Sequence, residues 1–245
     1  MNNEQPVVVA VDGPAASGKS TVSRAVAHTL GFNYVDSGAM YRTVTWKALE
    51  MGISVEDPVA VVGMLRTIKV NFELVDGGIR MLIDGVNPGD AIRNPRVTGK
   101  VSVVAAIPEV RQILVQYQRS LTGFGSLVME GRDIGSVVFP DTPHKFYLDA
   151  NPDIRAQRRA RDLEAMKVQA NRAGVAQELQ RRDKLDSTRQ TAPLQIAPGA
   201  TIVDNSKQGA DATAKIIVDH IRQQPGLRSF GGAGLRRGSA GIKAD

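Results

Sequence analysis

The fold of this 245-residue chain is decided by one stretch near its N-terminus, Val7-Val8-Val9-Ala10-Val11-Asp12-Gly13-Pro14-Ala15-Ala16-Ser17-Gly18-Lys19-Ser20-Thr21. Residues 7–11 form a short β-branched run, which is typical of a strand buried on both faces of a parallel sheet. Residues 13–20 match the pattern G-x-x-x-x-G-K-[ST], and a helical pattern follows to about Leu30. A strand, a glycine-rich loop and a helix in this order predict a phosphate-binding loop.

Phosphate binding explains why this loop consists of small residues. Without bulky side chains, the backbone N–H groups of about residues 15–20 can point at a phosphate, and the helix dipole also favours an anion there. Lys19 can reach the β- and γ-phosphate oxygens, and the Ser20 hydroxyl can ligate Mg²⁺. We therefore expect residues 13–21 to bind a nucleoside triphosphate, with Ser20 as a metal ligand.

Strand and helix patterns alternate along most of the remaining chain. Strands are predicted near residues 32–35, 126–129, 145–149 and 200–204, and helices near 39–51, 152–166, 175–184 and 210–223. This alternation favours an α/β fold with a parallel sheet of about five strands, covered by helices on both faces. Residues 69–75 and 79–84 flank a glycine turn and predict an antiparallel hairpin. We therefore expect a small inserted subdomain at about residues 55–95.

The C-terminal segment differs from the rest of the chain. Residues 226–245 are rich in glycine and show no hydrophobic periodicity, which predicts a disordered tail after a domain over residues 1–225. The formal net charge is +6, and four basic residues against one acidic residue put +3 of it in this tail. Aromatic residues make up only 4%, too few for a surface that stacks single-stranded bases. A small polyanion is favoured as ligand over a nucleic acid, except through the tail.

Composition excludes several other classes of protein. No apolar run approaches the roughly 20 residues that a bilayer requires, and the N-terminus lacks the pattern of a signal peptide. The sequence contains no cysteine, which excludes thiol catalysis, disulfides and thiolate zinc sites. We expect a cytoplasmic monomer without membrane association and without an obligatory protein partner.

Several arginines are predicted to lie near the phosphate loop. Residues 36–42 (DSGAMYR) follow the second strand, and residues 131–135 (GRDIG) follow the third. Since the carboxyl ends of parallel strands meet at one edge of a sheet, both segments should reach the edge that carries the loop. Arg155, Arg158 and Arg159 share one face of a predicted helix. Such a set could neutralise two facing phosphate groups, although each cluster alone also fits a solvated helix face or an ion pair.

Four segments in this order resemble the bacterial cytidylate kinases: GPAASGKST at 13–21, DSGAMYR at 36–42, GRDIGSVVFPD at 131–141 and RRDKLDSTR at 181–189. The resemblance covers about residues 5–222, and the second and third motifs are far more specific than the first. It implies a P-loop kinase core, a nucleoside-monophosphate-binding insertion and a mobile helical lid at about residues 152–190. It also implies transfer of the ATP γ-phosphoryl group to CMP or dCMP, with Mg²⁺, giving ADP and CDP or dCDP.

The resemblance further implies roles for single residues. It places Ser37, Arg42, Arg132 and Arg189 around the acceptor phosphate, Arg182 and Asp186 at its ribose, Ser102, Arg111 and Asp133 at the cytosine, and Tyr41 in the same site. The catalytic residues expected around the transferring group are Lys19, Arg132, Arg155, Arg158 and Arg189. For Asp133 the chemistry agrees, because a carboxylate accepts from the N4 amino group of cytosine but repels the corresponding oxygen of uracil.

Other functions stay open at this point. A kinase for another monophosphate or for a hydroxyl acceptor would also fit the loop. A hydroxyl acceptor needs a general base, and Asp36 could serve, whereas a phosphate acceptor is already largely dianionic at neutral pH and needs none. A nucleotide-dependent binding module, or a nucleic-acid binder acting through the basic tail, would fit the loop and the charge without any transfer chemistry.

Overall fold

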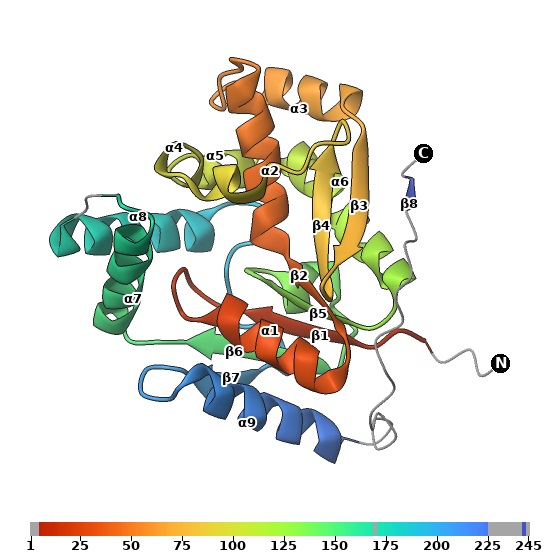
Figure 1. The fold of residues 1–245 in the computed structure, drawn as a ribbon, viewed down its shortest axis with the longest axis vertical. Coiled ribbons are helices and arrows are strands. Elements are labelled where there is room, and N and C mark those ends of the chain that lie inside the picture. Colours follow the sequence, from red (N-terminus) through yellow and green to blue (C-terminus); the bar gives the residue numbers. More distant parts are fainter. Residues whose placement is uncertain (1–4, 169–170, 225–241, 244–245) are drawn as a thin grey trace.

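The computed structural model describes residues 5–168, 171–224 and 242–243, and Figure 1 shows one sheet flanked by helices. The strands are β1 (Val8–Asp12), β2 (Asn33–Asp36), β3 (Val70–Val75), β4 (Gly78–Ile83), β5 (Leu127–Gly131), β6 (His144–Asp149), β7 (Thr201–Asp204) and the two-residue β8 (Ile242–Lys243). Their order in the sheet is β7-β6-β1-β5-β2-β4-β3-β8. All pairs from β7 to β4 are parallel, whereas β3 pairs antiparallel with both β4 and β8.

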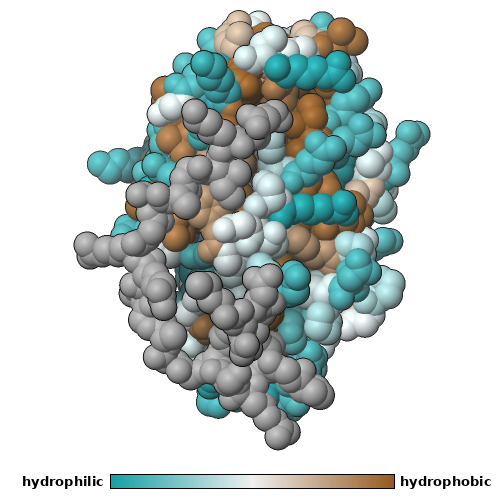
Figure 2. Space-filling view, turned by 90° about the vertical axis from the view of Figure 1, so that its right-hand side faces the viewer, coloured by the Kyte–Doolittle hydropathy of each residue, from teal (hydrophilic) through white to brown (hydrophobic). Residues whose placement is uncertain are grey.

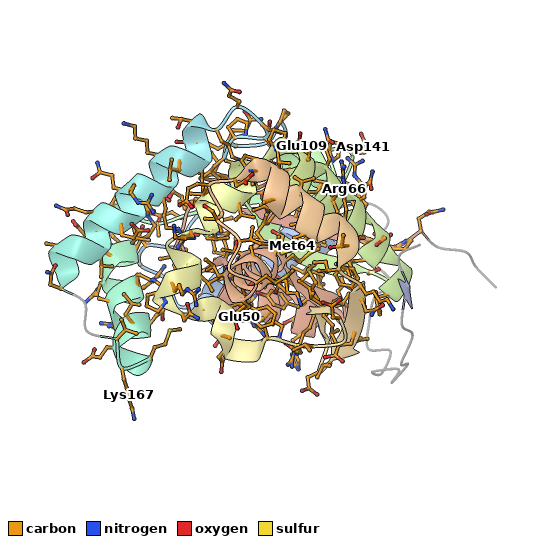
Figure 3. The ribbon with its side chains drawn as sticks, turned by 90° about the horizontal axis from the view of Figure 1, so that it is seen from above. Glu50, Met64, Arg66, Glu109, Asp141 and Lys167 are labelled. Carbon is orange, nitrogen blue, oxygen red and sulfur yellow. The ribbon has the colours of Figure 1, made fainter. Side chains whose placement is uncertain are left out.

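Helices cover both faces of this sheet. In the described ranges they are α1 (Lys19–Leu30), α2 (Ser37–Glu50), α3 (Pro58–Thr67), α4 (Pro95–Thr98), α5 (Val101–Ala106), α6 (Pro108–Ser120), α7 (Pro152–Ala165), α8 (Arg172–Thr188) and α9 (Ala210–Gln223). The pair α7–α8 projects from the sheet, and Lys167 lies at its tip when the molecule is seen from above (Figure 3). None of the helices in these ranges is long and apolar enough to cross a membrane.

The central strand β1 shows why the β-branched run forms the middle of the sheet. All five of its residues are buried, because helices lie on both faces. Val9 and Val11 pack into the core cluster formed with α1 and α9, whereas Ala10 between them faces the cluster formed with α2, α5 and α6. This alternation follows from the two-residue repeat of a strand. The prediction of a parallel strand buried on both faces is confirmed.

The prediction of a five-stranded sheet is wrong, because the inserted hairpin β3–β4 joins the main sheet. The hairpin itself forms as predicted, with all six residues of β3 paired to β4. In addition, β4 pairs in parallel with β2 through Tyr34–Gly78 and Val35–Ile79, and the N–H of Tyr34 donates to the Gly77 carbonyl at 2.7 Å. Without this pairing β2 would be an edge strand with unpaired backbone groups, which proteins generally avoid.

Most of the tail predicted at residues 226–245 lies outside the described residues. The exception is β8, in which Ile242 pairs with Phe72 and Lys243 pairs with Asn71 of β3. Figure 2 shows the molecule from the side on which β8 lies, and hydrophobic and hydrophilic side chains are interspersed over this face. The tail therefore has one described contact with the folded domain, at the end of the sheet.

Candidate active site

A cleft of about 760 Å³ opens where β1, β2 and β5 end. Its walls are the phosphate loop after β1, the start of α2 after β2, residues 130–133 at the end of β5, and side chains from α5, α7 and α8. This is the carboxyl edge of the parallel sheet, where ligands bind in folds of this type. The sheet topology thus brings together segments that lie more than a hundred residues apart in the sequence.

Two glycines of the phosphate loop are required by close neighbours. Gly13 has φ +149°, and a Cβ built on it would lie 2.1 Å from the carbonyl oxygen of Leu148 in β6. Gly18 has φ +93°, and its Cβ would lie 2.4 Å from Nδ2 of Asn205. Both values of φ are disfavoured for residues with a side chain, so the two positions accept only glycine. The loop is therefore folded tightly against β6 and the chain that follows β7.

Asn205, which also lines the cleft, holds the phosphate loop through its side chain. Its Nδ2 donates to the carbonyl of Ser17 at 2.7 Å, while its Oδ1 accepts from the hydroxyl of Thr213 at 2.8 Å. Arg158 of α7 also donates to Ser17 O, at 3.2 Å. No recognisable motif surrounds Asn205, so pattern reasoning had no means of finding this residue.

Lys19 lies at the centre of the loop and is buried. Its Nζ donates to the carbonyl of Pro14 at 2.6 Å and lies 3.4 Å from Ser17 Oγ. Burial, followed by the nearby charge of Arg132, lowers the pKa of Lys19 to about 7. An anion at the loop would reverse this shift, so the lysine is suited to respond to a phosphate.

Glu130 is a buried carboxylate that the sequence analysis missed. Its Oε1 accepts from the Tyr34 hydroxyl at 2.6 Å, and its backbone carbonyl accepts from Ser37 Oγ at 2.6 Å. Burial raises the pKa of Glu130, as does the neighbouring charge of Asp36, while hydrogen bonds from Ser20 and Tyr34 act in the opposite direction. Glu130 directly precedes the GRDIG segment at the end of a predicted strand, and this position could have indicated that it belongs to the site.

Several arginines of the cleft are paired with carboxylates. Arg42 donates to Asp36 at 2.8 Å, and Arg132 donates to Asp186 at 2.9 Å. Burial would raise the pKa of Asp36, but Arg42 and Arg93 outweigh it and keep the pKa below its ordinary value. Likewise, burial would lower the pKa of Arg132, but Asp186 raises it. These groups therefore keep their charges inside the cleft.

A second ion-paired group, of which Arg111 and Asp133 are buried, also lines the cleft. Asp133 accepts from Arg111 through one oxygen and lies 3.4 Å from Nη2 of Arg189 through the other. The guanidinium of Arg111 also stacks over the Tyr41 ring, 5.5 Å from its centroid. In the sequence these four residues lie in separate segments, and the tertiary structure brings them together.

Most of the predicted site residues line this one cleft. They are Ala15, Ala16, Ser17, Gly18, Lys19, Ser20, Thr21, Ser37, Tyr41, Arg42, Ser102, Arg111, Arg132, Asp133, Arg158, Arg182, Asp186 and Arg189. Burial, followed by the charge of Arg132, lowers the pKa of Arg182 to about 10. The arginines gathered in the cleft thus add to the effect of burial on the pKa of Arg182.

Gly13, Pro14 and Arg155 do not line the cleft. Arg155 instead forms an ion pair with Asp183 of α8 and donates to the carbonyl of Ala15 at 3.3 Å. The N–H of Ala15 in turn donates to Asp183 at 3.3 Å. Arg155 therefore connects α7, α8 and the outer side of the phosphate loop.

A glycine loop of this geometry on the first strand of a parallel sheet defines a P-loop protein of the α/β class, and arginines facing the loop define a kinase within that class. Comparison with known sequences identifies the family. The sequence profile described as "Cytidylate kinase" matches residues 9–223, so the chain belongs to the cytidylate kinase family.

Individual relatives agree with this assignment. A cytidylate kinase from Caldanaerobacter subterraneus subsp. tengcongensis is 42% identical over 89% of this chain and 95% of that protein. A cytidylate kinase from Mycobacterium avium is 43% identical over 91% of this chain and 96% of that protein. Among solved structures, a gluconokinase from Sinorhizobium meliloti 1021 has a TM-score of 0.46 at 13% identity, over 92% of this chain and 98% of that chain, which is too distant to bear on the reaction.

Proposed function

We propose that this protein is a cytidylate kinase, which transfers the γ-phosphoryl group of ATP to CMP or dCMP and releases ADP and CDP or dCDP. The observation that carries the proposal is that a single cleft is lined both by the phosphate loop and by the ion-paired group of Asp133, Arg111 and Arg189. Arg42, Arg132 and Arg182 line the same cleft. Two nucleotides whose phosphates meet in the middle match this distribution of charge.

The donor nucleotide is assigned to the phosphate loop. The loop N–H groups and the N-terminus of α1 favour phosphate. The Nζ of Lys19 contacts Pro14 and Ser17 of the same loop, so it lies where the phosphates would bind. The residues present also fit Mg²⁺, because the Ser20 hydroxyl and the buried Glu130 carboxylate are hard oxygen donors next to the triphosphate. When bound, Mg²⁺ would neutralise charge on the phosphates, and Ser20 is the residue that we expect to hold it.

We assign recognition of the cytosine base of the acceptor nucleotide to Asp133. A carboxylate has about four acceptor sites, and the two arginines leave room for a further hydrogen bond from the N4 amino group of cytosine. Arg111 and Arg189 supply donors, which suit the ring nitrogen and carbonyl of the same base. Uracil presents an oxygen where cytosine presents N4, so it would face a carboxylate of like polarity. A site built in this way can reject the wrong base by about 10⁴-fold.

The transfer itself needs no general base. An oxygen of the acceptor phosphate forms a bond to the γ-phosphorus while the bond to the bridging oxygen of ATP breaks, and ADP keeps the electron pair. Lys19, Arg132, Arg158 and Arg189 would stabilise the charge of the transferring group. Asp36, the base that a hydroxyl acceptor would require, is held as an anion by two arginines and also caps α2 through Ala39 N at 2.8 Å. This disfavours a hydroxyl acceptor.

The remaining parts are assigned as follows. The pair α7–α8 acts as the lid, and Arg155 would act indirectly by linking that lid to the phosphate loop. The insertion at about residues 55–95 would close over the acceptor, since Arg93 from this insertion lies 3.5 Å from Asp36 in the cleft. Closure of both would exclude water and suppress hydrolysis of ATP.

A coupled assay with MgATP tests the proposal by comparing CMP, dCMP, UMP and AMP as acceptors. We expect CMP and dCMP to be used far more efficiently than UMP or AMP. Asp133→Ala should reduce kcat/KM for CMP by about 100-fold or more while changing ATP binding little, because the buried base contact is lost. A strong preference for AMP or a non-nucleotide acceptor would contradict the proposal. Equal losses of CMP use and ATP binding in Asp133→Ala would assign Asp133 a structural role instead.

A further inference from the structure

Asp12, the last residue of β1, connects two strand ends through its side chain. The carboxylate is buried, and its two oxygens accept from the backbone N–H groups of Ile134 and Gly135, each at 2.8 Å. Burial raises the pKa of Asp12 to about 6, while these two hydrogen bonds act in the opposite direction. The carboxylate thus ties the residue before the phosphate loop to the turn that follows β5.

The turn held by Asp12 begins directly after Asp133. Asp133 precedes the single helical turn Ile134–Val138, a position at which an aspartate side chain ordinarily accepts from the first N–H groups of its own helix. Asp133 forms no such cap. One of the two donors that such a cap uses, the N–H of Gly135, is bonded to Asp12 instead, and the Asp133 carboxylate reaches Arg111 and Arg189 in the cleft.

The backbone of this turn is closely packed. A Cβ on Gly131 would lie 2.7 Å from Cδ1 of Ile134, and a Cβ on Gly135 would lie 3.2 Å from Cγ of Lys145. The turn therefore has little room to shift as a whole. If the hydrogen bonds from the two N–H groups to Asp12 were lost, the change that requires the least movement would be a rotation of the Asp133 side chain toward these N–H groups and away from the cleft.

We propose that Asp12 is a positioning residue for base recognition, because it caps the turn Ile134–Val138 from the neighbouring strand and so leaves the Asp133 carboxylate available to the acceptor base. Asp12 does not line the cleft, so it acts through Asp133. This inference rests on the proposed function, in which Asp133 accepts from N4 of cytosine.

The test compares kcat/KM for CMP and for UMP in the full-length protein and in Asp12→Asn. Asparagine keeps the size of the side chain, but its amide group replaces one acceptor by a donor that faces an N–H. We expect the CMP-to-UMP ratio to fall by about 10- to 100-fold, since small displacements of a recognition group have effects of this size. ATP is common to both reactions, so damage to the phosphate loop alone would lower both rates and leave the ratio unchanged.

A double variant separates positioning from a general structural role. In the Asp133→Ala background, Asp12→Asn should change the ratio no further, because the group through which Asp12 acts is gone. The matched control is Asn33→Ala, which removes a side-chain bond of the same length, 2.8 Å to the Phe124 carbonyl, outside the cleft. We expect it to lower the Tm without changing the ratio.

The outcomes are distinguishable. An unchanged ratio in Asp12→Asn, or an equal fall in the Asp133→Ala background, overturns the role of Asp12. Failure of the unaltered protein to phosphorylate CMP overturns the proposed function instead. Should Asp12→Asn not fold, the smaller Asp12→Ser removes the same carboxylate, and its ratio decides the question in the same way.

Discussion

At the scale of single residues, the cleft is organised around paired charges. Arg42 with Asp36, Arg132 with Asp186 and Arg155 with Asp183 are all cases in which a guanidinium is held by a nearby carboxylate. A buried charge without a partner is strongly unfavourable, so these pairs hold Arg42 and Arg132 in place in the cleft and Arg155 in place outside it. Lys19 is different, because its Nζ contacts in the loop are neutral oxygens.

This difference predicts that MgATP binding takes up a proton at Lys19. The pKa of Lys19 is about 7 because of burial, so at about pH 8 the amine is mostly neutral. Phosphate charges at the loop favour the ammonium form and raise the pKa, so on the order of one proton should be taken up on binding. Isothermal titration calorimetry at that pH, in two buffers of different ionisation enthalpy, measures this number.

Two variants complete this experiment. Lys19→Ala should abolish the proton uptake and reduce turnover by orders of magnitude, while the protein stays folded. Lys47→Ala removes a half-buried lysine that pairs with Asp84 at 2.8 Å outside the cleft, and it should keep both the uptake and the turnover. An apparent binding enthalpy that is independent of the buffer in the unaltered protein would contradict the prediction.

At the scale of elements, the pair α7–α8 has a small core of its own. Its buried apolar residues are Ala156, Val175 and Leu179, which pack with Ala15 of the phosphate loop. By contrast, α9 buries Ile217, Val218 and Ile221 within a large cluster shared with α1 and the sheet. An element with few buried apolar contacts opens at a lower free energy than one anchored in the main core.

We therefore predict that amide hydrogens exchange faster in α7–α8 than in α9 or β1. Adding MgATP together with CMP should slow exchange in α7–α8, because we assign arginines of these helices to the binding of both nucleotides. Exchange in α9 should change little and serves as the internal control. Hydrogen exchange followed by mass spectrometry measures all these segments at once, and equal protection of α7–α8 and α9 without nucleotides would refute the idea of a lid with its own weak core.

At the scale of the whole molecule, the cleft and the tail lie at different places on the sheet. The cleft is at the carboxyl ends of β1, β2 and β5, whereas the described part of the tail, β8, pairs with β3 at one end of the strand order. Figure 1 shows β8 on the side away from α7 and α8. No described contact connects the tail to a residue that lines the cleft.

We accordingly predict that a variant ending at residue 225 keeps its kcat/KM for CMP within about twofold, as expected for a distant change. The variant loses the +3 charge of residues 226–245, half of the net charge of +6. Binding to a polynucleotide, measured by fluorescence anisotropy at low salt, should weaken if the tail carries the basic surface. A large fall in CMP turnover would show instead that the tail supports the active site.

The sequence by itself determined the α/β class, the phosphate loop, the inserted hairpin and the segments that supply the arginines. These follow from local rules: β-branched runs form buried strands, and two glycines of the loop occupy backbone positions that other residues avoid. The kinase family was also evident from motifs. Such features depend on residues that are close together in the chain, so they can be predicted from pattern.

Only the tertiary structure decided how distant residues pair. The pairing of β2 with β4 extends the sheet beyond five strands. Asp133 pairs with Arg111 and Arg189, and Arg155 pairs with Asp183 outside the cleft. The tertiary structure also revealed Glu130, Asn205 and Asp12, none of which lies in a periodic pattern that marks its role. The physical reason is that these contacts join residues up to 188 positions apart, and their energy depends on three-dimensional geometry that no local pattern records.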